Sequence, residues 1–80
     1  MIKIISFLKI IFGETATVIQ ELKKIPEIVK IMTLTGEYDI LIEIETETSE
    51  QLSEVFLKKI DHIPGMKETH SNYILNIWEK

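Results

Sequence analysis

The chain has 80 residues, of which 45% are apolar, and a formal net charge of −4, so we expect one domain over residues 1–80 with a small core. It contains no cysteine, which excludes disulfides and thiolate metal sites and fits a reducing cytoplasm. All nine basic residues are dispersed lysines, and the acidic balance without arginine argues against direct binding to nucleic acid.

The first predicted element is a strand over residues 2–11. It is rich in isoleucine and carries apolar side chains at odd and even positions alike, which is typical of a central strand buried on both faces. Lys9 interrupts the apolar run and no small-residue cleavage site follows, so we interpret the segment as a strand rather than a signal peptide. No run approaches the roughly 20 apolar residues that a membrane span requires, and we expect a cytoplasmic protein.

A helix is predicted from about residue 15 to residue 24. Ile19 and Leu22 lie on one side at helical spacing, which indicates a face packed on a sheet. Glu14 or Thr15 is a candidate N-cap, and Pro26 ends the helix because proline cannot continue the hydrogen-bond ladder.

Residues 28–35 and 38–45 form a predicted hairpin around Gly36 and Glu37, where glycine suits the positive φ of a two-residue turn. This register places Thr35–Tyr38, Thr33–Ile40, Ile31–Ile42 and Val29–Ile44 opposite each other on one face. It places Leu34–Asp39, Met32–Leu41 and Lys30–Glu43 on the other face. The second face therefore carries apolar side chains, which indicates that a partner covers it.

A second helix follows the acidic segment 45–50, with Thr48 or Ser49 as its predicted N-cap. One stripe of this helix recurs at steps of three and four residues and is predicted to pack on the sheet; it comprises Leu52, Val55, Phe56, Lys59, Ile60 and Ile63. Pro64 and Gly65 end this helix, and the alternation from Met66 to Trp78 predicts a last strand.

The predicted order β-α-β-β-α-β indicates an α+β, ferredoxin-like fold. Right-handed connections favour an antiparallel four-stranded sheet of order 4-1-3-2 with both helices on one face. The other face would be uncovered in a monomer. We therefore expect dimerisation through this face, since covering about 500 Å² would give on the order of 10 kcal/mol before association costs.

Three segments resemble the RAM domain, the effector domain of the Lrp/AsnC transcription regulators. Residues 23–28, 35–40 and 63–71 are similar to its "LpeV", "tGeyDl" and "ipGVxxTxT" signatures, with Ser71 where threonine is usual. The resemblance implies a homodimer through the sheets, a higher ring such as an octamer, and an amino-acid effector near the hairpin turn. No helix-turn-helix precedes the first strand, so we expect a stand-alone RAM domain without DNA binding of its own.

The candidate ligand-binding residues lie first at the turn. Gly36 and Glu37 allow close approach to the main chain, Asp39 supplies an acceptor for an ammonium group, and Thr35 and Tyr38 flank them. Thr69 and Ser71 could add hydroxyl groups from a neighbouring subunit. The competing interpretation is that Gly36 is present only because the turn needs a positive φ, that Tyr38 only packs, and that Asp39 only ends a strand.

Our first hypothesis is a non-enzymatic, oligomeric module that senses an amino acid and modulates a full-length regulator of the same family. The alternatives are a small dimeric enzyme of the cofactor-independent monooxygenase or isomerase type, and a purely structural oligomerisation domain. Aliphatic residues at the helix-facing strand positions disfavour the enzyme. We predict no catalytic residue, cofactor or metal, and interpret His62 and His70 as surface or interface residues.

Overall fold

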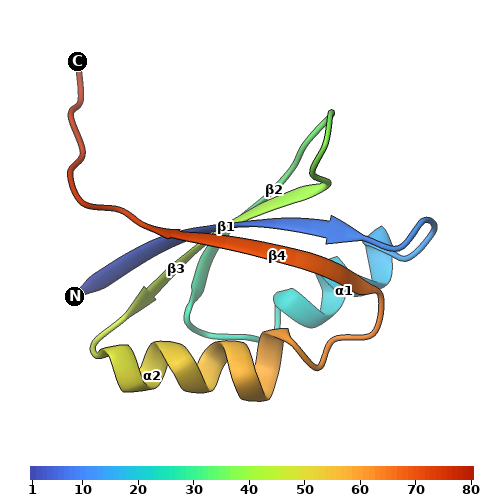
Figure 1. Ribbon diagram of the computed structural model, residues 1–80, viewed down its shortest axis with the longest axis horizontal. Coiled ribbons are helices and arrows are strands. Elements are labelled where there is room, and N and C mark those ends of the chain that lie inside the picture. Colours follow the sequence, from blue (N-terminus) through green and yellow to red (C-terminus); the bar gives the residue numbers. More distant parts are fainter.

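The computed structural model describes residues 1–80 and has the predicted order of elements (Figure 1). The elements are β1 (Ile2–Ile10), α1 (Thr15–Leu22), β2 (Ile28–Thr33), β3 (Ile40–Thr46), α2 (Ser49–Glu54), its π-helical continuation η1 (Val55–Ile60) and β4 (Met66–Tyr73). The four-stranded sheet is antiparallel in the order β2-β3-β1-β4, which is the predicted order read from the opposite edge. The ferredoxin-like α+β fold is therefore confirmed.

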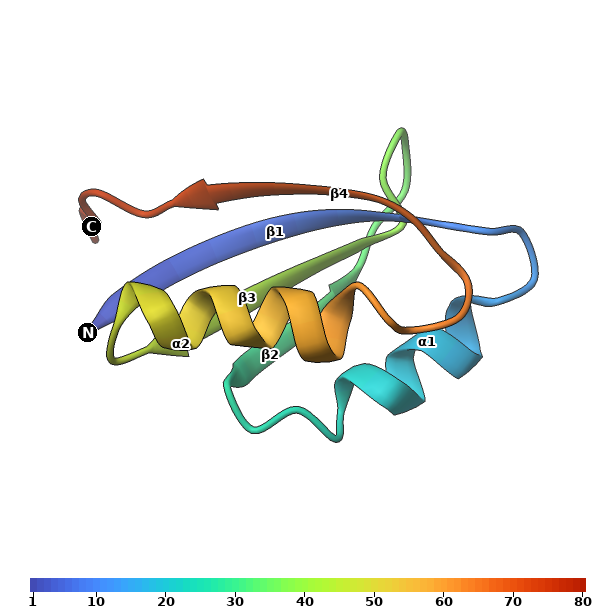
Figure 2. The same cartoon turned by 60° about the horizontal axis from the view of Figure 1, so that its bottom comes forward.

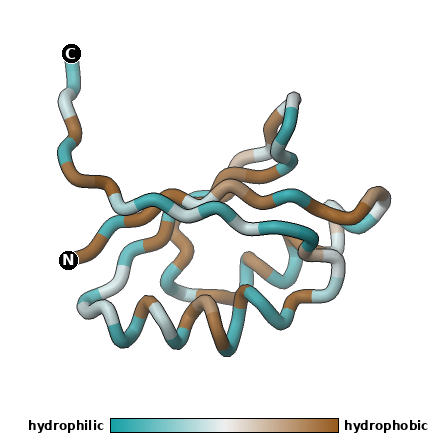
Figure 3. Tube along the Cα trace, in the orientation of Figure 1, coloured by the Kyte–Doolittle hydropathy of each residue, from teal (hydrophilic) through white to brown (hydrophobic).

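Both helices cover the same face of the sheet (Figures 1 and 2), and the core lies between these two layers. Alternate residues of β1 and β3 point to the helices because successive side chains of a strand point to opposite faces. Along α2 and η1 apolar and polar residues recur at helical spacing (Figure 3). The buried core residues are Ile4, Leu8, Ile10, Val18, Leu22, Ile25, Ile40, Ile42, Ile44, Leu52, Val55, Ile60 and Ile63.

The opposite face of the sheet is covered by no element of the chain (Figure 2). We call it the open face and define it by Ile5 and Phe7 of β1, Met32 of β2 and Leu41 of β3, which alternate with the helix-facing positions. All of them retain part of their surface in contact with solvent. The predicted apolar second face therefore exists, and its burial against a second subunit stays a prediction.

The hairpin register is confirmed between Lys30–Glu43 and Thr33–Ile40. The pairing of Val29 with Ile44 is wrong, because a bulge between Ile28 and Lys30 places Ile28 opposite Ile44. The bulge directs Ile28 toward the core and leaves Val29 52% exposed. One extra residue on the edge strand thus keeps the larger side chain packed and turns the smaller one outward.

The prediction of a two-residue turn is also wrong, because β2 ends at Thr33 and β3 begins only at Ile40. Leu34 does lie opposite Asp39, with a Leu34 N–H to Asp39 C=O hydrogen bond of 2.9 Å. Beyond that bond the chain opens into a loop, since the Asp39 N–H donates instead to the Leu8 carbonyl of β1 at 2.9 Å. Thr35 and Tyr38 therefore form no ladder pair.

The helix ends are close to their predicted positions. The Thr48 hydroxyl caps α2 by accepting from the Gln51 N–H at 3.1 Å, as predicted. Glu14 occupies the N-cap of α1 without a side-chain hydrogen bond, and α1 ends at Leu22 rather than at Lys24. No helix has the length and apolar character that a membrane crossing requires.

The last strand is shorter than predicted and ends at Tyr73 rather than at Trp78. The Ile74 N–H still donates to the Lys3 carbonyl at 2.9 Å, but β1 begins at Ile2. No neighbouring strand is left for the residues that follow. Residues 74–80 therefore leave the sheet as an extended segment (Figure 1).

Candidate functional site

The hairpin loop faces a cavity of about 770 Å³ that opens at one end of the sheet. Three segments distant in sequence meet there: the β2–β3 loop, the end of β1 with the loop that follows it, and the start of β4. The lining residues are Lys9, Ile10, Ile11, Phe12, Gly13, Thr15, Gly36, Glu37, Asp39 and Lys67. The structure thus brings together three of the predicted site residues, Gly36, Glu37 and Asp39.

Asp39 holds the hairpin loop against the end of β1. One of its carboxylate oxygens, Oδ2, accepts from the Ile10 N–H at 2.8 Å, and its own N–H donates to the Leu8 carbonyl at 2.9 Å. Asp39 therefore has the structural role that the competing interpretation gave it. A carboxylate has several acceptor positions, so one bonded oxygen leaves the second free to face the cavity.

Gly36 has a φ of +105°, and a Cβ atom added there would meet nothing within 4 Å. The positive φ confirms that the backbone requires glycine at this position. The open space also means that the main chain of the loop is accessible from the cavity. Gly13, on the opposite wall, has a φ of +86° and is equally unobstructed.

The cavity carries charges of both signs. Lys9 and Lys67 supply ammonium groups, and Glu37 and Asp39 supply carboxylates. Sequence reasoning missed both lysines and the wall formed by residues 11–13. Lys67 lies within the 63–71 segment, of which only Thr69 and Ser71 were predicted to bind the ligand. Nothing in the sequence placed Lys9 beside the hairpin loop.

Tyr38 does not line the cavity but packs on the open face of the sheet. Its ring lies 5.5 Å from the Phe7 ring and 5.4 Å from the His70 ring, measured between centroids. The Lys9 Nζ lies 5.9 Å from the Tyr38 centroid. Tyr38 thus fastens the loop to β1 and β4, while Thr35 is exposed at the loop and also lies outside the cavity lining.

Thr69 and Ser71 lie elsewhere, on the helix-facing side of β4 opposite Leu8 and Ser6. The Ser71 and Ser6 hydroxyls are 2.9 Å apart, which satisfies the buried Ser6 side chain. One chain therefore does not bring these two residues to the hairpin loop.

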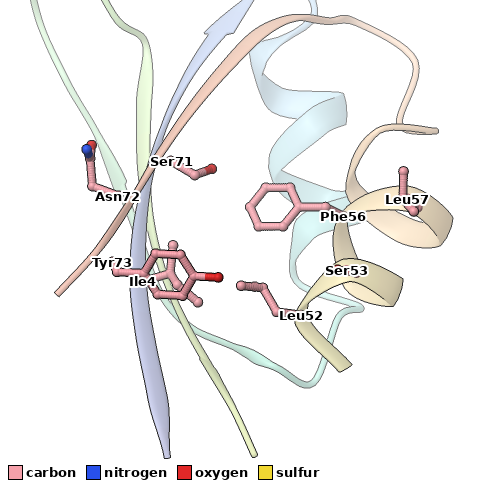
Figure 4. A pocket seen from close by; sticks show the side chains of 8 residues that line it. All are labelled: Ile4, Leu52, Ser53, Phe56, Leu57, Ser71, Asn72 and Tyr73. Carbon is pink, nitrogen blue, oxygen red and sulfur yellow. The ribbon is translucent and has the colours of Figure 1, made fainter. Parts of the chain in front are cut away.

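Ser71 borders a second cavity of about 410 Å³ between β4 and the helix formed by α2 and η1 (Figure 4). Figure 4 shows the Phe56 ring extending from the helix toward the strands and Asn72 pointing away from it. The lining residues are Ile4, Leu52, Ser53, Phe56, Leu57, Ser71, Asn72 and Tyr73. This cavity is mainly apolar and contains no lysine, carboxylate or histidine.

Glu27 connects the layers on the side of the fold away from the hairpin loop. Partial burial disfavours its charged form, but its own backbone N–H, the Lys59 ammonium and the Gln51 amide together hold the pKa of Glu27 below its ordinary value. The Lys59 Nζ lies 3.1 Å from Glu27 Oε1. This pair joins η1 to the start of β2.

No group of three or more His, Asp or Glu side chains is arranged to hold a metal ion. His62 follows the helix, and His70 packs edge-on against Tyr38.

Comparison with known proteins relates the chain to one family. Residues 9–79 match the family described as the Lrp/AsnC ligand binding domain. The HTH-type transcriptional regulator FL11 of Pyrococcus horikoshii is 40% identical over 67 residues, which cover 84% of this chain and 44% of that regulator. The chain thus spans less than half the length of this curated relative.

Several solved structures share the fold. Escherichia coli AsnC superposes with a TM-score of 0.90 at 18% identity, over 99% of this chain and 55% of that one. A transcriptional regulator from Neisseria meningitidis in complex with L-Met superposes with a TM-score of 0.88 at 20% identity, over 99% and 53% of the two chains.

Proposed function

This chain belongs to the family of Lrp/AsnC ligand-binding domains, and from that premise we propose that it is a non-enzymatic, oligomeric sensor of an amino acid that modulates a transcription regulator of the same family. The observation that carries the proposal is the 770 Å³ cavity at the hairpin loop with charges of both signs. The L-Met bound to the Neisseria regulator supports this class of ligand.

The chemistry of the cavity matches a zwitterion. The free oxygen of Asp39 and the Glu37 carboxylate would accept from the α-ammonium group, while Lys9 and Lys67 would pair with the α-carboxylate. Exposed main chain at Gly36 and Gly13 adds N–H donors. Ile11 and Phe12 form an apolar wall against which the ligand side chain would pack.

Assembly is the second part of the proposal. Two subunits would pack their open faces together, because this apolar surface has no cover within one chain. The cavity is wide and its Phe12 wall is fully exposed, so a second dimer closing over it would complete the site within a ring such as an octamer. In that ring the neighbouring subunit would contribute Thr69 and Ser71, and Thr35 and Tyr38 would border the ligand.

The enzyme alternative would use the space between helices and sheet. The second cavity lies there, yet the polar side chains of its lining are hydroxyls and the Asn72 amide, which points away from the helix, and none of them acts as a base near neutral pH. This supports binding rather than catalysis.

Thermal unfolding with a panel of the common amino acids, with mass by light scattering in parallel, tests the proposal. A ligand at about 100 times its dissociation constant adds roughly 2.7 kcal/mol per site, which is several degrees for a domain of this size. We expect a selective increase in Tm that Glu37→Gln and Lys67→Ala abolish. Neither side chain makes a hydrogen bond or ion pair within the chain, so both variants should keep the stability of the unliganded protein.

The matched control is Asp61→Asn, an exposed acidic residue beyond η1 and outside the cavity lining, which should retain the shift. A stable oligomer whose Tm responds to no amino acid would contradict sensing and favour the structural oligomerisation domain. A shift that survives both cavity variants would place the ligand elsewhere.

A further inference from the structure

Residues 74–80 carry three large apolar side chains that stay more than half exposed. Leu75, Ile77 and Trp78 are 87%, 59% and 83% exposed. We call this segment the arm. Three such residues within four positions form an exposed apolar strip, and such exposed apolar patches are typical of contact surfaces for a partner.

The direction of the arm is defined at its base. The Ile74 N–H donates to the Lys3 carbonyl at 2.9 Å, which holds the start of the arm at the sheet. Figure 1 shows the arm running away from the helices. This view places the arm on the side of the open face.

The base of the arm also leaves an unfilled hollow. Met1 and Lys3 line it together with residues 74–77, and its volume is about 330 Å³. A segment that packed back on its own subunit would close this space. The hollow instead stays open at the base of the arm, beside the first residues of the chain.

The reach of the arm matches a second subunit. Packed sheets lie about 10 Å apart, and the residues after Ile74 could extend roughly 20 Å. An arm that starts on the open-face side therefore spans the gap between two stacked sheets. Twofold symmetry would give each subunit the arm of the other.

We propose that the arm packs against a second copy of this chain in the sheet-to-sheet dimer and buries Trp78 there. The inference rests on the dimer in the proposed function and extends it, because it assigns part of the interface to a segment outside the ferredoxin-like core. A second copy of this chain would thus cover the open face, and both its sheet and its arm would hold it there.

Trp78 is the single tryptophan of the chain, so its fluorescence reports on the arm directly. We expect a blue-shifted emission and weak acrylamide quenching in the dimer. Dilution below the dimer dissociation constant, or the open-face variant Leu41→Glu, should shift the emission to the red and increase the quenching constant several-fold.

Two further variants measure the contribution of the arm. Trp78→Ala should raise the dimer dissociation constant about tenfold or more, as expected for a buried interface tryptophan. The matched control is Lys80→Ala on the same segment, which should leave the dissociation constant unchanged. Equal effects of both variants would contradict the proposal.

The remaining outcomes separate this inference from the proposed function. A dimer whose Trp78 is quenched as readily as a free tryptophan overturns the inference alone. A tryptophan that stays protected in the Leu41→Glu monomer also overturns it, because the arm would then pack on its own chain. A chain that is monomeric at all concentrations overturns both the inference and the proposed assembly, whereas the amino-acid response tests the ligand site separately.

Discussion

Asp39 combines a structural bond with a position at the candidate ligand cavity. Its Oδ2 accepts from the Ile10 N–H, and its side chain is only half-buried. Hydrogen bonds to charged groups contribute about 1.5–3 kcal/mol, and partial exposure places this one toward the lower end. Loss of the carboxylate would therefore weaken the fold and the site together.

We predict that Asp39→Ala lowers the free energy of unfolding by about 1–2 kcal/mol. Urea denaturation measures this change, and Glu37→Ala on the same loop serves as the control with an expected change within about 0.5 kcal/mol. Equal stability of the two variants would show that the bond to Ile10 contributes nothing, and Asp39 would then be free to act on the ligand alone.

Gly65 differs from the other glycines with positive φ. Its φ is +95°, and a Cβ would lie 2.8 Å from Glu14 Cβ and 3.1 Å from Val18 Cγ2. The loop before β4 thus approaches the start of α1 closely, which the Pro64–Gly65 helix stop in the sequence did not reveal.

We predict that Gly65→Ala lowers the free energy of unfolding by about 2–4 kcal/mol, because backbone strain adds to overpacking. Gly13→Ala shares the positive φ without a neighbour within 4 Å, so its cost should be only about 1–2 kcal/mol. Thermal or urea unfolding of both variants separates the two contributions, and equal losses would contradict the close approach.

At the scale of elements, the helix after Thr48 shows how far local pattern predicts structure. The N-cap and the apolar members of the stripe were predicted correctly, but Lys59 is exposed, and the change to π-helix over Val55–Ile60 was not predicted. Its Asp61 N–H donates to the Phe56 carbonyl at 2.8 Å. A π-helical turn has no residue preference comparable to an N-cap, so periodicity alone could not reveal it.

The contact between η1 and β2 through Lys59 and Glu27 predicts a pH dependence. The pKa of Glu27 is below its ordinary value of 4.5 in the folded state. Its carboxylate therefore stabilises the fold above the unfolded-state pKa, and this contribution is lost as the pH falls through the lower folded-state pKa. Glu27→Gln should accordingly flatten the decrease in stability on acidification below about pH 4.5.

Unfolding free energies between pH 3 and 7 check this prediction, with a loss at neutral pH of up to about 1 kcal/mol for a pair of this exposure. Glu21→Gln is the control, since Glu21 pairs with Lys24 at 2.6 Å and both of these side chains are more exposed than Glu27. The same flattening in both variants would assign the effect to net charge rather than to the Glu27 environment.

At the scale of the whole molecule, the open face determines the assembly that we propose. Leu41 lies on β3, an inner strand of the sheet, beside Met32 and Phe7. A charge at this position would have to be buried without a partner in a sheet-to-sheet dimer, and such burial costs several kcal/mol.

We predict that Leu41→Glu yields a folded monomer, with the mass measured by light scattering and the fold by circular dichroism. Leu57→Glu, on the exposed side of η1, is the matched control and should keep the mass of the wild-type oligomer. An unchanged mass for Leu41→Glu would exclude the open face as the interface.

By itself, the sequence determined the order of the elements, the sheet topology, most of the hairpin register and the family. These follow from local periodicity, turn residues and short motifs, which act between near neighbours in the chain. Three features were decided only by the tertiary structure: the bulge at Val29, the early end of β4, and the set of residues that line the cavity. Lys9, Gly36 and Lys67 line that cavity together because antiparallel strands bring residues distant in sequence to one edge. Ser71 lies further along β4, opposite Ser6, beyond the irregularity in the β1–β4 register at Lys9 and Ile10.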